Sequence, residues 1–290
     1  MHIWTPNVIA ALIWAVAPIF AFGFAGDWIV RALQKIPLTL RLIVPAILGV
    51  PYALAGSHWS RGNWLVIYFG LPIIIAVLLL HARQADPQQN GDWRDFAVLA
   101  VLGLAVDLRW LESAWPAHLS VISKLILLDS ALYGFLVIRQ LSNAGFDLRI
   151  HVKDLVIGFR ELAFFAPIAI PLGLFLGFLE FHHRVPKTSS AALSLVFTFF
   201  LIAIPEEIFF RGWLQNLLER RIGSRSALIL TALIFGFSHF NKRSIHFNWR
   251  YVLLAAIAGI FYGRAWSSRH RVAASAITHT CVDTIWSLWL

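Results

Sequence analysis

The chain has 290 residues, of which 59% are hydrophobic and 13% are charged, and its mean hydropathy is +0.73. This composition excludes an ordinary soluble globular protein. The 24 Lys and Arg outnumber the 15 Asp and Glu, but the basic residues stand in short connections between apolar runs, a pattern typical of membrane-protein loops. We therefore expect an all-α, polytopic transmembrane helical bundle that contacts membrane lipids and has no nucleic-acid partner.

The apolar runs predict about eight to ten membrane helices, because roughly 20 apolar residues cross a hydrocarbon layer of about 30 Å. The runs at 96–107 and 226–240 are short, so we expect them to be tilted, re-entrant or extended by polar flanks. The location expected for such a chain is a bacterial inner membrane, as a multi-pass integral protein. In chain order, the expected spans are 8–26, 42–57, 63–81, 96–107, 117–138, 155–180, 190–210, 226–240, 251–266 and 272–289.

Two polar stretches, 81–96 and 142–154, interrupt the apolar pattern and read as connections outside the membrane. The second one divides the chain into an N-terminal helical region, 1–150, whose role is open, and a C-terminal region, 151–290. Ionisable residues at membrane depth are costly, so each one in the C-terminal region is a functional candidate that needs a partner.

The first polar set is the stretch EEIFFR, which begins at Glu206. Glu207 and Arg211 are four residues apart, the spacing at which a carboxylate pairs with a guanidinium on one helix face. Glu206 points about 100° away around the helix, so it is free to meet a different partner. The alternative interpretation is that both acids belong to an interfacial salt-bridge network.

The second and third sets are FGFSH and HTCVD. Phe235 and His239 share a helix face, and hydrogen-bonded packing is the alternative role for this histidine. His279 and Asp283 are also four residues apart, inside the closing apolar run. We expect Asp283 to hold the His279 ring by accepting its N–H.

These residue types suit hydrolysis of an amide, because a carboxylate and a histidine around one water remove its proton while other polar groups stabilise the oxyanion. Glu206, His239 and His279 from three helices also satisfy the rules for a zinc ion with an open water position. A third possibility is a proton- or metal-coupled transporter, in which the same groups form a relay with charges such as Lys124 and Asp129.

The order EExxxR, FxxxH and HxxxD resembles the CAAX-protease and bacteriocin-processing family of intramembrane endopeptidases, also called the Abi family, over roughly 155–290. The resemblance implies an intramembrane endopeptidase that cleaves a peptide or protein presented at the membrane. It implies that Glu206 is the general base on the attacking water and that His239 assists it. A non-catalytic immunity or scaffold protein of the same fold is a further alternative.

The resemblance also suggests roles for the other residues of the three motifs. It places His279 and Asp283 at the oxyanion side, whereas Glu207 and Arg211 support the site or position the substrate, and Phe235 is expected to bind substrate. Many members have asparagine at the position of Asp283. An ionised aspartate repels an oxyanion, so we expect Asp283 to orient His279 or to be protonated.

The family has been described both as metalloproteases and as glutamate-dependent proteases, and both remain open here. The sequence lacks an HExxH-like pair from which to build a compact metal site, so we expect no obligatory metal. Zinc remains possible, with Glu206, His239 and His279 as its ligands.

Overall fold

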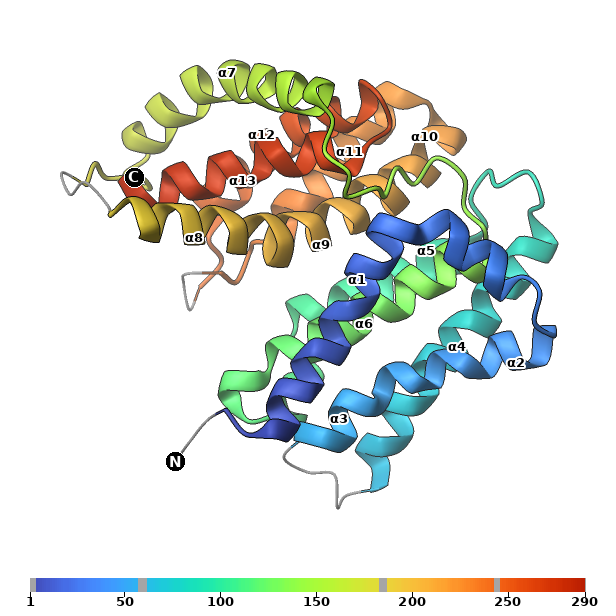
Figure 1. Ribbon diagram of the computed structural model, residues 1–290. Coiled ribbons are helices and arrows are strands. Elements are labelled where there is room, and N and C mark those ends of the chain that lie inside the picture. Colours follow the sequence, from blue (N-terminus) through green and yellow to red (C-terminus); the bar gives the residue numbers. More distant parts are fainter. Residues whose placement is uncertain (1–3, 57–61, 183–186, 243–245, 290) are drawn as a thin grey trace. The chain divides into compact units, whose positions relative to one another are not determined.

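The computed structural model describes residues 4–56, 62–182, 187–242 and 246–289, and within these ranges the ordered elements are helices, with no strand. The chain divides into two compact units, Met1–Ser142 and Asn143–Leu290, each drawn in Figure 1 as a bundle of helices. The expected all-α bundle is thereby confirmed.

The N-terminal unit is organised around an arginine that is completely buried. Arg139 Nε and Nη2 each lie 2.9 Å from an oxygen of Asp95, and Nη2 is 2.7 Å from Asp86 Oδ2. Such charge-assisted, bidentate pairs are among the strong hydrogen bonds of proteins. The helices of this unit are α1 (Pro6–Leu33), α2 (Leu38–Ile43), η1 (Val44–Gly49), α3 (Val50–Ala55), α4 (Gly62–Ala85), α5 (Trp93–Asp107), η2 (Glu112–Ala114), η3 (Ala117–Leu119), α6 (Val121–Tyr133) and η4 (Gly134–Ile138).

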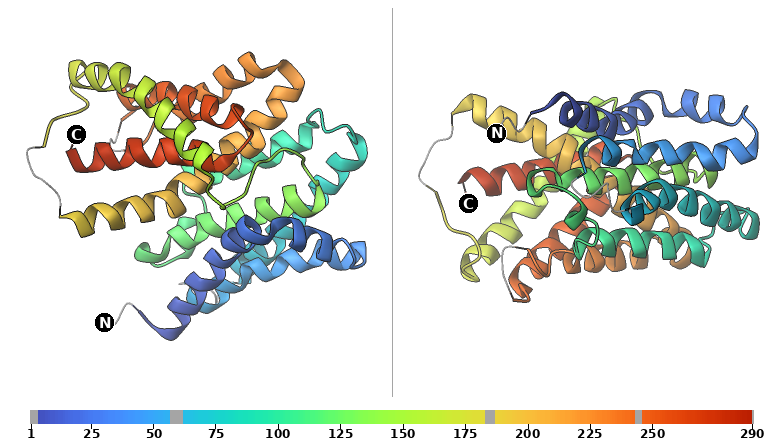
Figure 2. Two further views of the ribbon diagram at one scale, coloured as in Figure 1. Left: turned by 45° about the horizontal axis from the view of Figure 1, so that its top comes forward. Right: turned by 90° about the horizontal axis from the view of Figure 1, so that it is seen from below.

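The C-terminal unit has α13 at its centre. This helix lies between α7 and α8 in Figure 1 and in the left view of Figure 2, and it also packs against α12, which packs against α11. A residue on α13 is therefore within reach of several helices. The elements of this unit are α7 (Val152–Phe175), α8 (Thr188–Thr198), η5 (Phe199–Ala203), α9 (Ile204–Glu207), η6 (Ile208–Gln215), α10 (Asn216–Ile222), α11 (Ser224–Phe237), α12 (Trp249–Ser267) and α13 (Val272–Trp289).

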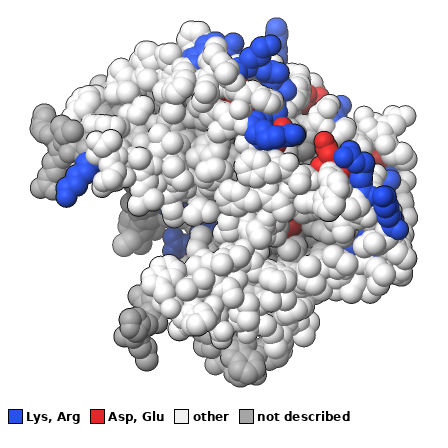
Figure 3. All heavy atoms as spheres, in the orientation of Figure 1, with Lys and Arg blue, Asp and Glu red and all other residues white. Residues whose placement is uncertain are grey.

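Six helical stretches of the described residues are long and apolar enough to cross a membrane. The expected spans α5 and α11 are shorter, with 15 and 14 residues, and α12 and α13 are long enough but contain arginines or the His279–Asp283 pair. Figure 3 shows that most of the visible surface is uncharged. The six spans are Pro6–Leu33, Leu38–Ala55, Asn63–Ala85, Ala117–Ile138, Val152–Phe175 and Thr188–Ile222.

The segment that follows Ser142 folds onto the start of α13, within the C-terminal unit. The Val272 N–H donates to the Gly145 carbonyl at 2.9 Å, and Arg271 Nη1 lies 3.2 Å from Asp147 Oδ2. Burial alone would raise the pKa of Asp147, but hydrogen bonds from Arg149 and Arg271 hold that pKa below its usual value. A backbone hydrogen bond and an ion pair therefore hold this segment against the start of α13.

Replacing Gly145 by alanine is expected to destabilise the C-terminal unit. Gly145 has φ +69°, and a Cβ there would lie 2.1 Å from the His270 carbonyl oxygen. Gly223 has φ +81° and ψ 158° with no atom near its Cβ position, so Gly223→Ala measures the cost of a positive-φ backbone alone, about 1–3 kcal/mol. Thermal unfolding in detergent should show a larger fall in Tm for Gly145→Ala than for Gly223→Ala. Equal Tm values for the two variants would contradict this account.

Candidate active site

The helix that carries the glutamate pair is continuous from Thr188 to Ile222 and contains two π-helical segments, η5 and η6, on either side of α9. Pro205 within α9 lacks an N–H, so one hydrogen bond of regular helix is lost at this point. π-Helical turns of this kind are frequent at functional sites. The two glutamates of this helix differ in burial: the Glu207 side chain is fully buried, whereas that of Glu206 is 27% exposed.

Glu207 is the buried hub of the site. Arg211 Nε lies 3.2 Å from its Oε2, as the four-residue spacing predicted. Its Oε1 is 2.8 Å from His279 Nδ1, and its Oε2 also accepts a hydrogen bond from the Ser275 hydroxyl. Glu207 thus joins α9 and η6 to α13.

Arg211 is held behind the site rather than at its surface. Its Nη2 donates to the Gly259 carbonyl of α12 at 3.0 Å. Its guanidinium carbon lies 4.7 Å from the Phe235 ring centroid and 5.5 Å from that of Tyr262, within the range of cation–π attraction. The side chain is fully buried, so its contribution runs through Glu207 and the helices that it joins.

His279 is oriented by two carboxylates. A carboxylate accepts hydrogen bonds, so the contact with Glu207 places a hydrogen on Nδ1. The other nitrogen, Nε2, lies 3.4 Å from Asp283 Oδ2 and 3.9 Å from Glu206 Oε2. The expected contact with Asp283 is present, but the closer partner is Glu207. The ring also stacks on Tyr262, with centroids 4.6 Å apart.

His239 is fixed from its own helix. Its Nδ1 lies 2.8 Å from the Phe235 carbonyl oxygen, which only accepts, so Nδ1 carries the hydrogen and Nε2 has the lone pair. That Nε2 is 3.3 Å from Lys242 Nζ. The same ammonium nitrogen is 3.7 Å from Glu206 Oε1, so it connects the two groups expected to activate water.

The structure therefore brings Glu206, His239 and His279 to one place, and their catalytic roles stay predictions. Phe235 is 2% exposed, and its ring lies 4.9 Å from that of His239 and 5.9 Å from that of His279. From this position it supports both histidines, and the substrate contact expected of it also stays a prediction.

Sequence reasoning missed two side chains that contact the site. Ser275 precedes His279 by four residues on α13, a spacing that places both side chains on one helical face, and Lys242 follows His239 by three residues in the turn after α11. These spacings were the available signal. Neither residue belongs to one of the three motifs, so each looked like an ordinary loop or helix residue.

A metal ion does not fit the groups as they lie. Among the described residues, no group of three or more His, Cys, Asp or Glu side chains has the geometry to hold one. The Lys242 ammonium contacts both Glu206 and His239, and a second cation between them would be repelled. We assign no step to a metal.

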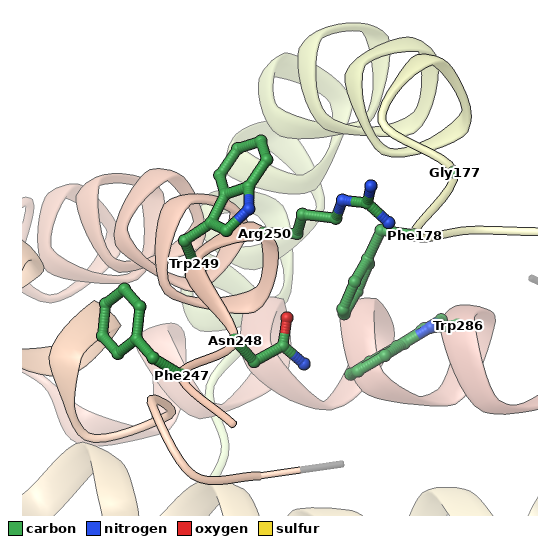
Figure 4. A pocket seen from close by; sticks show the side chains of 7 residues that line it. All are labelled: Gly177, Phe178, Phe247, Asn248, Trp249, Arg250 and Trp286. Atoms are coloured by element: carbon green, nitrogen blue, oxygen red, sulfur yellow. The ribbon is translucent and has the colours of Figure 1, made fainter. Parts of the chain in front are cut away.

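A cavity of about 450 Å³ opens in the same unit. Figure 4 shows the rings of Phe178 and Trp286 side by side, with the Arg250 side chain extending toward Phe178. The Tyr251 ring lies 5.3 Å from Phe178, 5.2 Å from Trp286 and 4.8 Å from His239, so contacting rings lead from the cavity to the active-site histidine. The lining residues are Gly177, Phe178, Phe247, Asn248, Trp249, Arg250 and Trp286.

Comparison with known families supports one interpretation of the three motifs, the resemblance to CAAX proteases. Residues 188–285 match the family model described as type II CAAX prenyl endopeptidase Rce1-like. This segment is similar to the Rce1-like family of CAAX prenyl endopeptidases. No curated protein and no solved structure matches the chain. The Rce1-like segment contains all three motifs, from Glu206 to Asp283, and the predicted resemblance is confirmed.

Proposed function

We propose that the chain is an intramembrane endopeptidase of a bacterial inner membrane, which hydrolyses a peptide bond of a membrane-presented peptide or protein. The Rce1-like core supports a membrane peptidase in general. The observation that carries the finer proposal is the placement of Glu206: its side chain is 27% exposed, its Oε1 lies beside the ammonium that contacts His239, and its buried Oε2 lies beside His279 Nε2 with no hydrogen-bond partner among the residues that the structure describes. A carboxylate so placed is available to a water molecule, whereas Glu207 is not.

In the proposed reaction, Glu206 removes a proton from water while the lone pair of His239 Nε2 accepts a hydrogen bond and aims the oxygen. The oxygen of that water forms a bond to the peptide carbonyl carbon, giving a tetrahedral oxyanion. The C–N bond then breaks, and the proton held by Glu206 passes to the leaving nitrogen. Water is consumed, a carboxylic acid and an amine are formed, and no electron is transferred to or from another group.

Glu207 serves this reaction as a positioning residue. Because it holds the hydrogen of His279 on Nδ1, it fixes the direction in which Nε2 points. Asp283, with 30% of its side chain exposed, contacts that same Nε2. We propose that these two carboxylates orient the imidazole from opposite sides.

The transporter alternative has less support, because several of the other charges are paired locally, although the buried Asp129 Oδ1 has no hydrogen-bond partner among the described residues. Lys124 Nζ lies 3.0 Å from Glu112 in the N-terminal unit. In the C-terminal unit, Arg160 and Arg264 both pair with Glu161, at 2.8 and 3.0 Å. Pairs of this kind are typical of helix anchoring. Purified protein in detergent, incubated with quenched fluorescent peptides, tests the proposal: cleavage supports it, and proton or metal flux in vesicles without cleavage would contradict it.

We further propose that this cavity, which is lined by the rings of Phe178 and Trp286 and by the polar groups of Asn248 and Arg250, binds a side chain of the peptide. Trp286→Ala removes one wall of this cavity, so KM should rise by about tenfold, the equivalent of about 1.4 kcal/mol. Trp289→Ala, on the same helix but outside the lining, is the matched control and should leave KM unchanged. Steady-state cleavage of a peptide series with small and large apolar residues gives the measurement. An equal KM for both variants would exclude the cavity as a substrate site.

A further inference from the structure

The site contains a cation that the three motifs do not supply. We propose that Lys242 is a further catalytic residue, whose ammonium group stabilises the oxyanion formed when water attacks the peptide carbonyl. The assignment rests on the proposed endopeptidase function. It gives a role to a side chain that contacts both groups expected to activate water, Glu206 and His239.

The need for such a cation follows from the charges of the other candidates. Asp283 has no amide N–H to offer, and when ionised it repels an oxyanion. His279 uses Nδ1 to bind Glu207, and its Nε2 faces the carboxylates of Glu206 and Asp283. Arg211 is fully buried and donates to the Gly259 carbonyl. The conventional donors of the site are therefore directed elsewhere.

Lys242 has a fixed backbone and a partly exposed side chain, which together suit a donor that must follow a changing charge. Its backbone N–H donates to the His239 carbonyl and its own carbonyl accepts from Asn248 Nδ2, both at 3.2 Å. Its side chain is 38% exposed. A carbonyl attacked by a water between Glu206 and His239 places its oxygen within reach of the same ammonium.

The proposed step needs no proton transfer from the lysine. As the carbon–oxygen bond to water forms, the π electrons of the carbonyl move onto its oxygen, and an N–H of Lys242 donates to the resulting O⁻. When the substrate carbonyl binds, the ammonium turns from His239 Nε2 toward the carbonyl oxygen, so the histidine lone pair is available to the water before it attacks. When the C–N bond breaks, the carbonyl re-forms and the ammonium returns.

The test compares Lys242→Ala, Lys242→Gln and Lys242→Arg in cleavage of a quenched peptide by the full-length protein in detergent. Removing an oxyanion donor lowers kcat by about 10²–10³-fold, and we expect this loss for the alanine and glutamine variants with KM nearly unchanged. Arginine, which keeps the positive charge, should restore part of kcat. Lys153→Ala, at an exposed lysine of the same unit, is the matched control.

A second measurement separates transition-state binding from structural damage. A phosphinate peptide carries an anionic tetrahedral oxygen, so its Kd should weaken in Lys242→Ala by the same factor as kcat/KM, whereas the Kd of the product peptide should not change. A wild-type kcat in Lys242→Ala, with Glu206→Gln inactive, would overturn the assignment alone. An increased kcat would also overturn the assignment, because it would show that the Lys242 side chain blocks access to Glu206 and His239. Full activity of Glu206→Gln would overturn both this assignment and the proposed function.

Discussion

Glu206→Gln should lower kcat by about 10³-fold, because an amide cannot remove a proton from water and general-base catalysis contributes 10²–10⁴-fold. The same change should leave Tm nearly unchanged. The Glu206 side chain is partly exposed, and its ionic partners, Lys242 and His279, lie 3.7 and 3.9 Å away. The contact with Lys242 is partly exposed and both contacts are longer than a hydrogen bond, so they contribute little to stability. Peptide cleavage and thermal unfolding in the same detergent provide both measurements.

Glu180→Gln is the matched control, because Glu180 is an exposed glutamate of the same unit that lies outside the site. It should behave as wild type in both assays. Retention of more than a tenth of wild-type kcat by Glu206→Gln would show that another group activates the water. A large fall in Tm would show instead that Glu206 is a structural residue.

Glu207→Ala should cost both stability and activity, in contrast to its neighbour. The change leaves the buried Arg211 without its carboxylate, and breaking a buried pair by removing one partner typically costs about 3–5 kcal/mol. It also frees His279 Nδ1, so the imidazole can rotate or exchange its hydrogen between nitrogens. The free energy of unfolding and kcat should therefore fall together.

A double variant separates the two effects of Glu207. In Glu207→Ala combined with Arg211→Met, the uncompensated charge is gone, so part of the lost stability should return, as replacement of buried ion pairs by apolar residues often allows. Activity should stay low, because nothing holds His279. If kcat recovered together with stability, Glu207 would contribute to the fold alone. If stability did not recover, the uncompensated charge of Arg211 would not be the cause of the destabilisation.

Local spacing explains why part of the site could be predicted from the sequence. Residues four apart on a helix face the same side whatever the rest of the fold does, so the Glu207–Arg211 and His279–Asp283 contacts follow once their segments are helical. The distinction between the two glutamates follows from the same geometry, since neighbours differ by about 100° in direction. The all-α bundle follows from composition and span length.

The remaining contacts depend on how helices cross, which periodicity does not determine. Glu207 binds a histidine 72 residues away in the chain, and only the packing of α9 against α13 makes that possible. Lys242 lies in the turn after α11 and contacts Glu206 of α9. In the sequence it stands in a basic connection between apolar runs, so nothing marked it as a neighbour of Glu206. The expected spans α12 and α13 are helices, but the arginines of α12 and the His279–Asp283 pair of α13 reduce their apolar character.

The π-helical segment η5, which precedes the two glutamates, also sets the direction in which their side chains point relative to α13. A π turn adds one residue to a helical turn, so it shifts the direction of every later side chain, by about 100° for one added residue. Deleting a single residue from η5 would turn Glu207 away from His279 and bring a different side chain into its place. Insertions or deletions ahead of Pro205 should accordingly be far less tolerated than substitutions, since they change the direction of every later side chain in this helix.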